Sequence, residues 1–403
     1  PSYLFYSLFQ LTNACGPGFL DCARLLNAAL LVAAAPFIYL IARQVCNRTA
    51  SAVLALAGIM APVSSFTAYF MPETMYFLSF FVFAWAALSF TSARPLAYGL
   101  ATGALLGLMA AIKVHALFLL PAHLAFIVYL CLSQYRNDGW LRRALIMMAA
   151  AALAMVAVRL AVGYAVAGQA GLSFFGQFYG TQANNTSSTL AALLNMVPAA
   201  LVSLKGHMLG LALLMSLPLA TLLLHVCDRQ VRAQSTPQQR TLQAFALLML
   251  GAAGGLAVVY TASIAHIAPL EGIRLHQRYY DFAFPLLMVI AAAPLALPAA
   301  RQSLARRVLV ALPLAAAVVY AARVIPTQYS AGLVDTPELT VLVQFPVMMT
   351  LTVALALLAL AVWALHRRAG ILLFLFVVLP VMAYVSSSGV GEIQGRSRTP
   401  GDY

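Results

Sequence analysis

The sequence predicts an all-α polytopic membrane protein. Of its 403 residues, 63% are hydrophobic and 8% are charged, whereas soluble domains are about 45–50% apolar and about 25% charged. Apolar runs of about twenty residues, long enough to cross roughly 30 Å of hydrocarbon as a helix, recur along the chain and predict about twelve transmembrane helices. These runs lie at residues 24–45, 50–70, 74–92, 95–112, 116–134, 143–167, 207–227, 242–264, 283–299, 306–324, 346–365 and 370–387.

The distribution of basic residues predicts the orientation of these spans. If the first span runs inward, fourteen of the 23 Lys and Arg residues fall in short loops on one side, as is typical of cytoplasmic loops. The net charge of +13 is then explained by topology and by the lipid bilayer, with no nucleic-acid partner. The fourteen are Arg43, Arg48, Arg94, Arg136, Arg142, Arg143, Arg229, Arg232, Arg240, Arg301, Arg306, Arg307, Arg367 and Arg368. We therefore expect a multi-pass protein of the cell (inner, cytoplasmic) membrane, of bacterial origin.

The two ends of the chain extend this topology. We expect a multi-pass domain over residues 1–387 and the start of an extracytoplasmic tail over residues 388–403, which are polar and Gly-rich. Because the topology places Pro1 outside, an N-terminal helix and a first outer loop are expected to precede it. The sequence does not indicate the oligomeric state.

Polar and irregular segments concentrate on the predicted outer side, so the active face is expected to be extracytoplasmic. The longest, residues 168–206, contains Phe174, Phe175, Phe178 and Tyr179. It also contains an apolar stretch around Pro198 that is too short to span, and we expect this stretch to lie along the interface or to re-enter the membrane.

The acidic residues form a short list, because the chain has only ten. Glu73 is the best candidate among the outer ones, since it follows Pro72 at a turn between two spans. Desolvation there would raise its pKa and suit it to act as a base or to hold an acceptor hydroxyl. The alternative is that Glu73 only caps the helix that starts at Thr74. The outer acids are Asp21, Glu73, Glu271, Asp281, Asp335, Glu338, Glu392 and Asp402.

Three further polar positions stand within or beside apolar runs. Lys113, with His115 two residues later, either offers a point charge to a phosphate or pyrophosphate group or extends to lipid head groups without a specific role. Arg159 lies inside the run 143–167, where an Arg costs about 2.5–3.5 kcal/mol, so it is expected to face the protein interior or to extend outward. His123 is expected to be a hydrogen-bonded interior residue.

A cluster of charged and aromatic residues occurs in residues 266–285, HIAPLEGIRLHQRYYDFAFP, between two apolar runs. Arginine and histidine beside tyrosines can hold an anionic phosphate and stack on a sugar or prenyl chain. The alternative is a solvated loop with an aromatic belt at the membrane interface. The candidate binding residues are Glu271, Arg274, His276, Arg278, Tyr279 and Tyr280.

The five cysteines divide by predicted side. Cys46, Cys131 and Cys227 fall at cytoplasmic ends, where thiols stay reduced. Cys15 and Cys22 share an outer segment that can hold a disulfide, although two free thiols are the expectation. No cysteine or histidine spacing indicates a metal site, and a divalent metal remains an open alternative.

Several short segments in the first third of the chain carry a family resemblance. They are PSYLFYSLFQL at the start, Arg24 to Asn27 opening a span, Ile41 to Arg43 closing it, Ala61-Pro62, Met71 to Glu73, and GLMAAIKVHALFLLP at residues 107–121. In this order they resemble the membrane glycosyltransferases of the GT-C fold, the protein mannosyltransferase-like superfamily that uses dolichyl- or undecaprenyl-phosphate sugars. The resemblance implies a polyprenyl-phosphate-sugar donor, displacement at the anomeric carbon, and an acidic catalytic base in an outer loop just ahead of Pro1. It also implies that Glu73 is the acid of the second loop and that Lys113 contacts the carrier phosphate.

We therefore expect an extracytoplasmic glycosyltransferase acting on a lipid, glycan or protein acceptor. A transporter or flippase of lipid-linked saccharide is one alternative, but transporters tend to keep charged groups near mid-membrane, where this chain has only Arg159. A surface polysaccharide polymerase or ligase is another, and it would need similar outer Arg and His residues.

Overall fold

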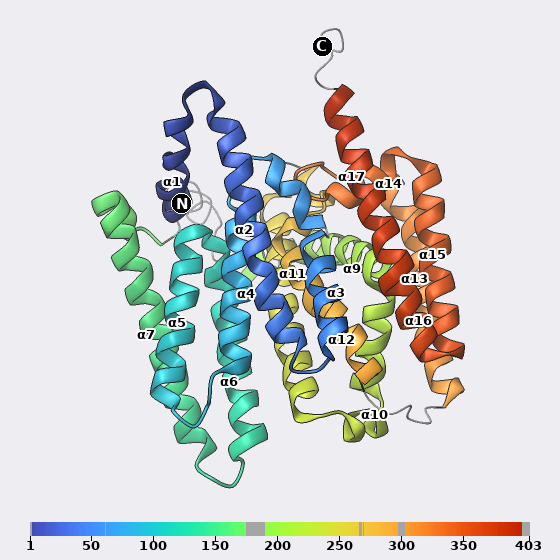
Figure 1. Ribbon diagram of the computed structural model, residues 1–403, viewed down its shortest axis with the longest axis horizontal. Helices are drawn as coiled ribbons and strands as arrows, with labels where there is room; N and C mark the ends of the chain where they lie inside the picture. The colour runs from blue at the N-terminus through green and yellow to red at the C-terminus, as the bar shows by residue number, and fades with distance from the viewer. Residues whose placement is uncertain are drawn as a thin grey trace. The chain divides into compact units, whose positions relative to one another are not determined.

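The computed structural model describes residues 2–60, 62–174, 190–265, 268, 270–296 and 303–396 (Figure 1). These residues are almost entirely helical, and within them the only β pairing is an isolated bridge between Arg274 and Ser330. The prediction of an all-α fold is therefore confirmed.

Nine helical segments among the described residues are long and apolar enough to cross a membrane. The predicted count of about twelve is not confirmed, because the other three runs form shorter helices, namely Arg48–Met60, Glu73–Ser89 and Asp281–Ala296. Two of these helices have a proline near one end. Arg48–Met60 is followed by a 3₁₀ segment that starts at Pro62, and Glu73–Ser89 begins directly after Pro72. The nine are Tyr3–Ala42, Pro95–Ile112, Val114–Tyr135, Trp140–Leu172, Leu194–Cys227, Pro237–Ile264, Leu304–Gln328, Pro346–Leu365 and Arg367–Glu392.

The chain forms two compact units, and each draws on more than one part of the sequence. The first comprises Pro1–Ile41, Phe66–Asn195 and Thr241–Leu256, and the second comprises Ala42–Ser65, Met196–Arg240 and Ala257–Tyr403. Four elements contribute residues to both units, namely α2 (Phe19–Ala42), of which only Ala42 falls in the second unit, η2 (Pro62–Ala68), α9 (Leu190–Cys227) and α11 (Pro237–Ile264).

The first unit begins with a hairpin of α1 and α2 (Figure 1). The chain reverses in η1 at Gly16, whose φ of 56° favours glycine. Cys15 and Cys22 form a disulfide beside this turn, so the expectation of two free thiols is wrong. The remaining elements of this unit are α4, α5, η3, α6, α7 and η4. Their bounds, with those of the hairpin, are α1 (Tyr3–Phe9), η1 (Gln10–Gly18), α2 (Phe19–Ala42), α4 (Glu73–Ser89), α5 (Pro95–Ile112), η3 (Val114–Phe118), α6 (Leu119–Tyr135), α7 (Trp140–Ala167) and η4 (Gly168–Leu172).

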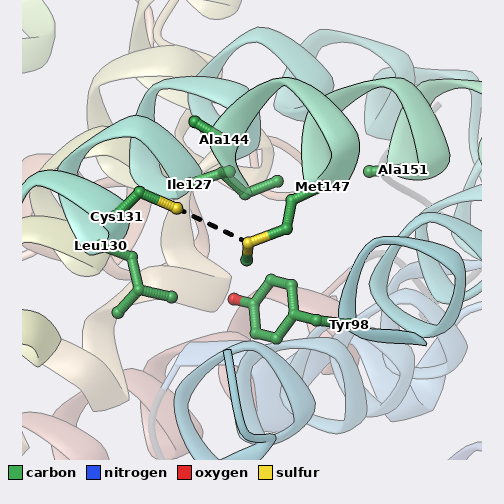
Figure 2. Packing of buried hydrophobic residues seen from close by; sticks show 7 residues of the cluster. All are labelled: Tyr98, Ile127, Leu130, Cys131, Ala144, Met147 and Ala151. Carbon is green, nitrogen blue, oxygen red and sulfur yellow. Dashed lines mark hydrogen bonds between the residues drawn. The ribbon is translucent and has the colours of Figure 1, made fainter. Parts of the chain in front are cut away.

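Helices α5 and α7 pack closely because α5 presents glycines at every fourth position. A Cβ added to Gly99, Gly103 or Gly107 would collide with the α7 backbone, so this small-residue stripe permits the close approach that is common between membrane helices. Figure 2 shows the core beside this contact, where Tyr98 of α5 lies near Met147 of α7 and Cys131 of α6. The Cys131 thiol donates to the Met147 sulfur at 3.6 Å.

The second unit contains the remaining helices. In this unit α14 packs against α17, where a Cβ on Gly389 would collide with the Val341 side chain. Its elements are α3 (Arg48–Met60), α10 (Arg229–Gln234), η5 (Glu271–Ile273), η6 (Gln277–Tyr279), η7 (Asp281–Ala283), α12 (Phe284–Ala292), η8 (Ala293–Ala296), α13 (Leu304–Gln328), α14 (Pro337–Gln344), α15 (Pro346–Leu365), α16 (Arg367–Leu373), the π-helical turn η9 (Phe374–Val378) and α17 (Leu379–Arg396).

Two segments differ in extent from the expected ones. The stretch around Pro198 is not a short re-entrant segment, because it continues into the following apolar run as the single helix α9, with an irregular residue at Met215. Helix α17 continues to Arg396 and so includes residues 388–396, the first nine residues of the expected tail. Residues 397–403 and the loop residues Phe175, Phe178 and Tyr179 lie outside the described part of the chain.

Candidate functional site

Glu73 and Lys113 form a buried ion pair in the first unit. Glu73 is the first residue of α4 and Lys113 directly follows α5, and the Lys113 ammonium donates to Glu73 Oε1 at 2.9 Å. Both residues are buried, with exposed fractions of 6% for Glu73 and 8% for Lys113. Lys113 therefore does not extend to lipid head groups, and Glu73 is not an isolated buried acid.

The backbone around Glu73 is held by α2. The Asn27 side-chain amide donates to the Tyr69 carbonyl at 2.8 Å, and its carbonyl oxygen accepts from the Thr74 hydroxyl at 2.5 Å. Asn27 and Thr74 are both fully buried, so this bridge fixes the segment that carries Glu73. His115 is also buried, in η3 directly after Lys113.

One oxygen of the Glu73 carboxylate remains available in this arrangement. Oε2 accepts no hydrogen bond from the described residues, whereas Oε1 is bound by Lys113. A buried acceptor without a donor is costly, and a substrate hydroxyl can supply the donor. Glu73 Oε2 is thus a buried acceptor without a donor among the described residues, in a pair whose charges compensate each other.

The two other polar residues predicted for the interior of this unit are both buried. Arg159 has no exposed surface and donates to the carbonyls of Gly171 at 3.0 Å and Ser173 at 2.9 Å. The Tyr3 ring lies 5.3 Å from its guanidinium carbon. His123 lies within 2.9 Å of the Thr102 hydroxyl, so its predicted role as a hydrogen-bonded interior residue is confirmed. These contacts secure helices and a loop, and neither residue lies in a described cavity.

A second cluster, in the second unit, is built around the carboxylate of Asp335. We call Glu271, Arg274, His276, Arg278 and Asp335 the Asp335 cluster. Arg278 Nε lies 2.8 Å from Asp335 Oδ1, and Arg274 contacts Asp335 Oδ2. His276 lies between two acids, with Nδ1 3.4 Å from Asp335 Oδ1 and Nε2 3.5 Å from Glu271 Oε2. Arg274 also donates to Glu271 Oε1 at 2.8 Å.

Backbone contacts hold the two parts of this cluster together. The Arg278 N–H donates to the Asp335 carbonyl at 2.9 Å. The Arg274–Ser330 bridge adds bonds from Leu275 N to Ser330 O and from Ser330 N to Ile273 O, both 3.0 Å. The positions of the charged groups are thus fixed by main chain as well as by charge.

Aromatic rings line the same cluster. Tyr279 stacks on the His276 ring with centroids 5.4 Å apart and planes inclined by 10°. The Tyr260 ring meets both of them edge-on. Tyr280 points to a different partner, because its hydroxyl lies 3.1 Å from His207 Nδ1. Of the two predicted tyrosines, Tyr279 belongs to the cluster and Tyr280 to the neighbouring interior.

The acids and bases of the Asp335 cluster differ in exposure. The Asp335 side chain is 1% exposed, whereas those of Arg274 and Arg278 are 37% and 23% exposed. Burial raises the pKa of Asp335, but its contact with His276 and the charges of Arg278 and Arg274 outweigh this and hold the pKa at about 2. Two arginines are thus balanced by two carboxylates, so a phosphate here would be bound by oriented N–H donors more than by excess positive charge.

The structure brings together five of the residues predicted to bind substrate, four that contact Asp335 or one another and a fifth, Tyr279, that stacks on His276, and it adds one that the sequence analysis did not select. Asp335 had been placed among the outer acids without a role, although it lies 57 residues after Arg278 and joins both arginines. One signal was available, because the segment Asp335-Thr336-Pro337-Glu338 puts two of only ten acids between apolar runs. His266, the first residue of the predicted cluster, lies outside the described residues.

No group of three or more His, Cys, Asp and Glu side chains is placed to hold a metal ion within the described residues. The Asp335 cluster has two acids and one histidine, but its acids are bound to arginines.

Residues 16–162 match the family model of the dolichyl-phosphate-mannose-protein mannosyltransferases. The match confirms the resemblance to GT-C membrane glycosyltransferases over this part of the chain, which contains Glu73, Lys113 and Arg159. Together with the apolar helices, it indicates a multi-pass membrane protein. No curated protein and no solved structure matches the chain.

Proposed function

We propose that this chain is a GT-C-type glycosyltransferase that takes a sugar from a polyprenyl-phosphate-linked donor, and that Arg274 and Arg278 contact the donor phosphate. The observation that carries the proposal is the buried carboxylate of Asp335, which holds two partly exposed guanidinium groups between apolar helices. Guanidinium groups bind phosphate through paired N–H donors. A lipid phosphate needs such donors next to a membrane-embedded apolar surface.

The arrangement suits departure of a phosphate from a sugar. In the proposed step an acceptor hydroxyl attacks the anomeric carbon, the bond from that carbon to the phosphate oxygen breaks, and polyprenyl phosphate leaves. A carboxylate base takes the hydroxyl proton. Arg274 and Arg278 stabilise the charge that develops on the leaving phosphate, which is an electrostatic role of donors held in place beforehand.

Glu73 has a separate role in the proposal. Its Oε2 is the candidate acceptor for a substrate hydroxyl, because Lys113 binds only Oε1. Lys113 holds the carboxylate in place through this contact, and we assign it to positioning. The predicted direct contact of Lys113 with the carrier phosphate stays a proposal, and its occupied ammonium argues for the positioning role instead.

The test uses undecaprenyl phosphate, the product shared by donors with different sugars, and undecaprenol as its neutral counterpart. Affinities are measured with the purified chain in detergent. Arg274→Ala and Arg278→Ala should each weaken undecaprenyl phosphate binding by about 1.5–3 kcal/mol, the size of a hydrogen bond to a charged group. Lysine at either position should restore only part of the affinity, because it lacks the planar guanidinium group that binds two phosphate oxygens at once.

Arg323→Ala provides the matched control, since Arg323 is an exposed arginine of α13 in the same unit. It should leave both affinities unchanged. The alternative of an interfacial aromatic belt predicts that the arginine variants bind undecaprenyl phosphate normally, while Tyr279→Ala lowers protein yield. Unchanged affinity in both arginine variants would rule out the phosphate contact.

A further inference from the structure

A cavity of about 570 Å³ lies within the second unit. Its wall is formed by α3, α9, α12, α14, η9 and α17, and most of the lining side chains are apolar. The volume is within the roughly 300–1,000 Å³ of small-molecule sites. The cavity is therefore large enough for a ligand, and its lining favours an apolar one.

The rim of the cavity is apolar and exposed. Leu56 and Met60 of α3, Phe376 of η9 and Tyr384 of α17 all line it, and each is more than half exposed. Helix α17 belongs to a segment that is long and apolar enough to span a membrane. A ligand that enters past these side chains comes from the hydrocarbon phase, so it is a lipid and not a water-soluble metabolite.

Glu338 is the one charged residue among the described residues that line this cavity. Its side chain is 7% exposed, and apart from its own backbone amide neither carboxyl oxygen has a hydrogen-bond partner in the described residues. A buried polar group without a partner is unfavourable by about 1–3 kcal/mol. A ligand that supplies a partner to Glu338 would remove this cost.

The chemistry of the lining decides which partner fits. No Lys, Arg or His of the described chain lines the cavity, so a phosphate or carboxylate would meet one acid, Glu338, and the serines Ser64, Ser386 and Ser387, with no basic group to balance its charge. Burial, together with the charge of Asp281, raises the pKa of Glu338 to about 8. At neutral pH its carboxyl group is therefore mostly protonated, and it can donate one hydrogen bond to a neutral oxygen.

We propose that this cavity binds a membrane lipid bearing a neutral oxygen, a hydroxyl or an ester carbonyl, and that Glu338 donates a hydrogen bond to that oxygen. The ligand differs from the donor of the proposed transferase reaction, because the cavity lacks the basic groups that a phosphate needs. The proposal stands on the cavity and Glu338 alone, so it does not depend on transferase activity.

The probe for the test is a photoactivatable 1-hexadecanol in lipid nanodiscs that contain the full chain, displaced by unlabelled 1-hexadecanol to give an affinity. The label should map to peptides of α3 and α17. Glu338→Leu should weaken binding about tenfold, the equivalent of one hydrogen bond. Glu338→Gln, which can still donate, should stay within about threefold of the wild type.

Two variants in which phenylalanine replaces an alanine test whether the ligand occupies the cavity volume. Ala57→Phe places a ring in the cavity wall and should abolish labelling, whereas Ala354→Phe, on an exposed position of α15, should not change it. Melting temperatures of all variants identify any that fail to fold. The Glu338→Gln variant preserves shape and hydrogen bonding, so it keeps the test informative if Glu338→Leu unfolds.

Raising the pH from 7 to 9.5 should weaken hexadecanol binding to the wild type, because the ionised carboxylate cannot donate, and should not affect Glu338→Gln. Among the described titratable groups, Asp281 and Tyr280 interact electrostatically with Glu338, and the Tyr280 hydroxyl lies 3.1 Å from His207 Nδ1. Three outcomes would overturn the proposal. They are preference for hexadecylamine, which indicates a cation site, displacement by hexadecyl phosphate as effective as by hexadecanol, and unchanged binding in Glu338→Leu.

Discussion

The ion pair of the first unit and the Asp335 cluster of the second differ in how each buried carboxylate is compensated. Among the described residues Glu73 pairs with one cation, Lys113, which is about as buried as the acid itself. Asp335 is shared by two arginines and a histidine, and the arginines are partly exposed. A buried pair of this kind presents no exposed cation and leaves only one carboxyl oxygen, Glu73 Oε2, without a donor, whereas a buried acid that holds exposed cations can present them to a ligand.

Glu338 extends the comparison to a buried acid with no cation, since none is described beside its carboxyl group. It lies only three residues after Asp335, yet its pKa is raised to about 8 while that of Asp335 is lowered to about 2. Burial raises the pKa in both cases, so the neighbouring cations decide the direction. The three acids should therefore respond differently to mutation.

The largest effect is expected when Lys113 is removed. Lys113→Met leaves Glu73 buried beside an uncharged chain, and breaking a buried pair from one side typically destabilises by about 3–5 kcal/mol. A clear drop in melting temperature in detergent would follow. The double variant Glu73→Gln, Lys113→Met should recover more than half of the loss, because no uncompensated charge remains.

Arg143→Met is the control for this prediction, since Arg143 pairs with the exposed Asp138. Exposed pairs contribute about 0–1 kcal/mol, so its melting temperature should change little. If Lys113→Met were no less stable than Arg143→Met, the first-unit pair would not be a structural pair.

A smaller effect on stability, with a distinct effect on binding, is expected for Asp335→Asn. The arginines keep part of their hydration, so we expect the free energy of unfolding to fall by about 2 kcal/mol, less than the value of about 3–5 kcal/mol for a fully buried pair. Undecaprenyl phosphate binding should weaken about tenfold, because Arg274 and Arg278 lose the group that orients them. Asp335→Glu should restore part of the affinity. Tighter phosphate binding in Asp335→Asn would mean that its charge opposes the ligand and that it does not position the arginines.

The third prediction concerns the dependence of stability on pH through Glu338. Its pKa in the folded protein, about 8, exceeds the ordinary value of 4.5, so between these values the folded state binds more protons than the unfolded state. The stability contributed by the protonated acid is complete below pH 4.5 and is lost as the pH rises through about 8, by at most about 1.4 kcal/mol per pH unit. The decline in melting temperature between pH 5 and 8 should be shallower in Glu338→Gln. Parallel profiles for the two proteins would show that Glu338 is not the titrating group.

The membrane class and most helices could be predicted from the sequence because hydropathy is a local property. Among the described residues each predicted run overlaps a helical segment, but three of these segments are too short to count as spans. The disulfide between Cys15 and Cys22 was not expected, since free thiols and a bond have the same local pattern and only the turn at Gly16 brings the two together.

The candidate sites were predicted only in part, because their partners are distant in the sequence. Glu73 and Lys113 were each selected, but nothing local indicates that they bind each other across forty residues. Arg274 and Arg278 were selected by their charge and spacing, whereas Asp335 and Glu338 acquire their roles from helices that pack around them. Long-range pairing of charges leaves no periodic signal, so rarity of acids was the only available indication.

The smallest effect is expected at Glu271, the peripheral acid of the Asp335 cluster. Its side chain is 28% exposed and it pairs with the partly exposed Arg274, so Glu271→Gln should change stability by less than about 1 kcal/mol. Because the substitution removes a negative charge while Asp335 still orients both arginines, undecaprenyl phosphate should bind about threefold more tightly at low salt. Screening should reduce this gain at 0.5 M salt. The change in phosphate affinity should thus have opposite signs in Glu271→Gln and Asp335→Asn, because Glu271 only repels the phosphate whereas Asp335 positions the two arginines that bind it. Weaker phosphate binding in Glu271→Gln would show that Glu271 also positions the arginines.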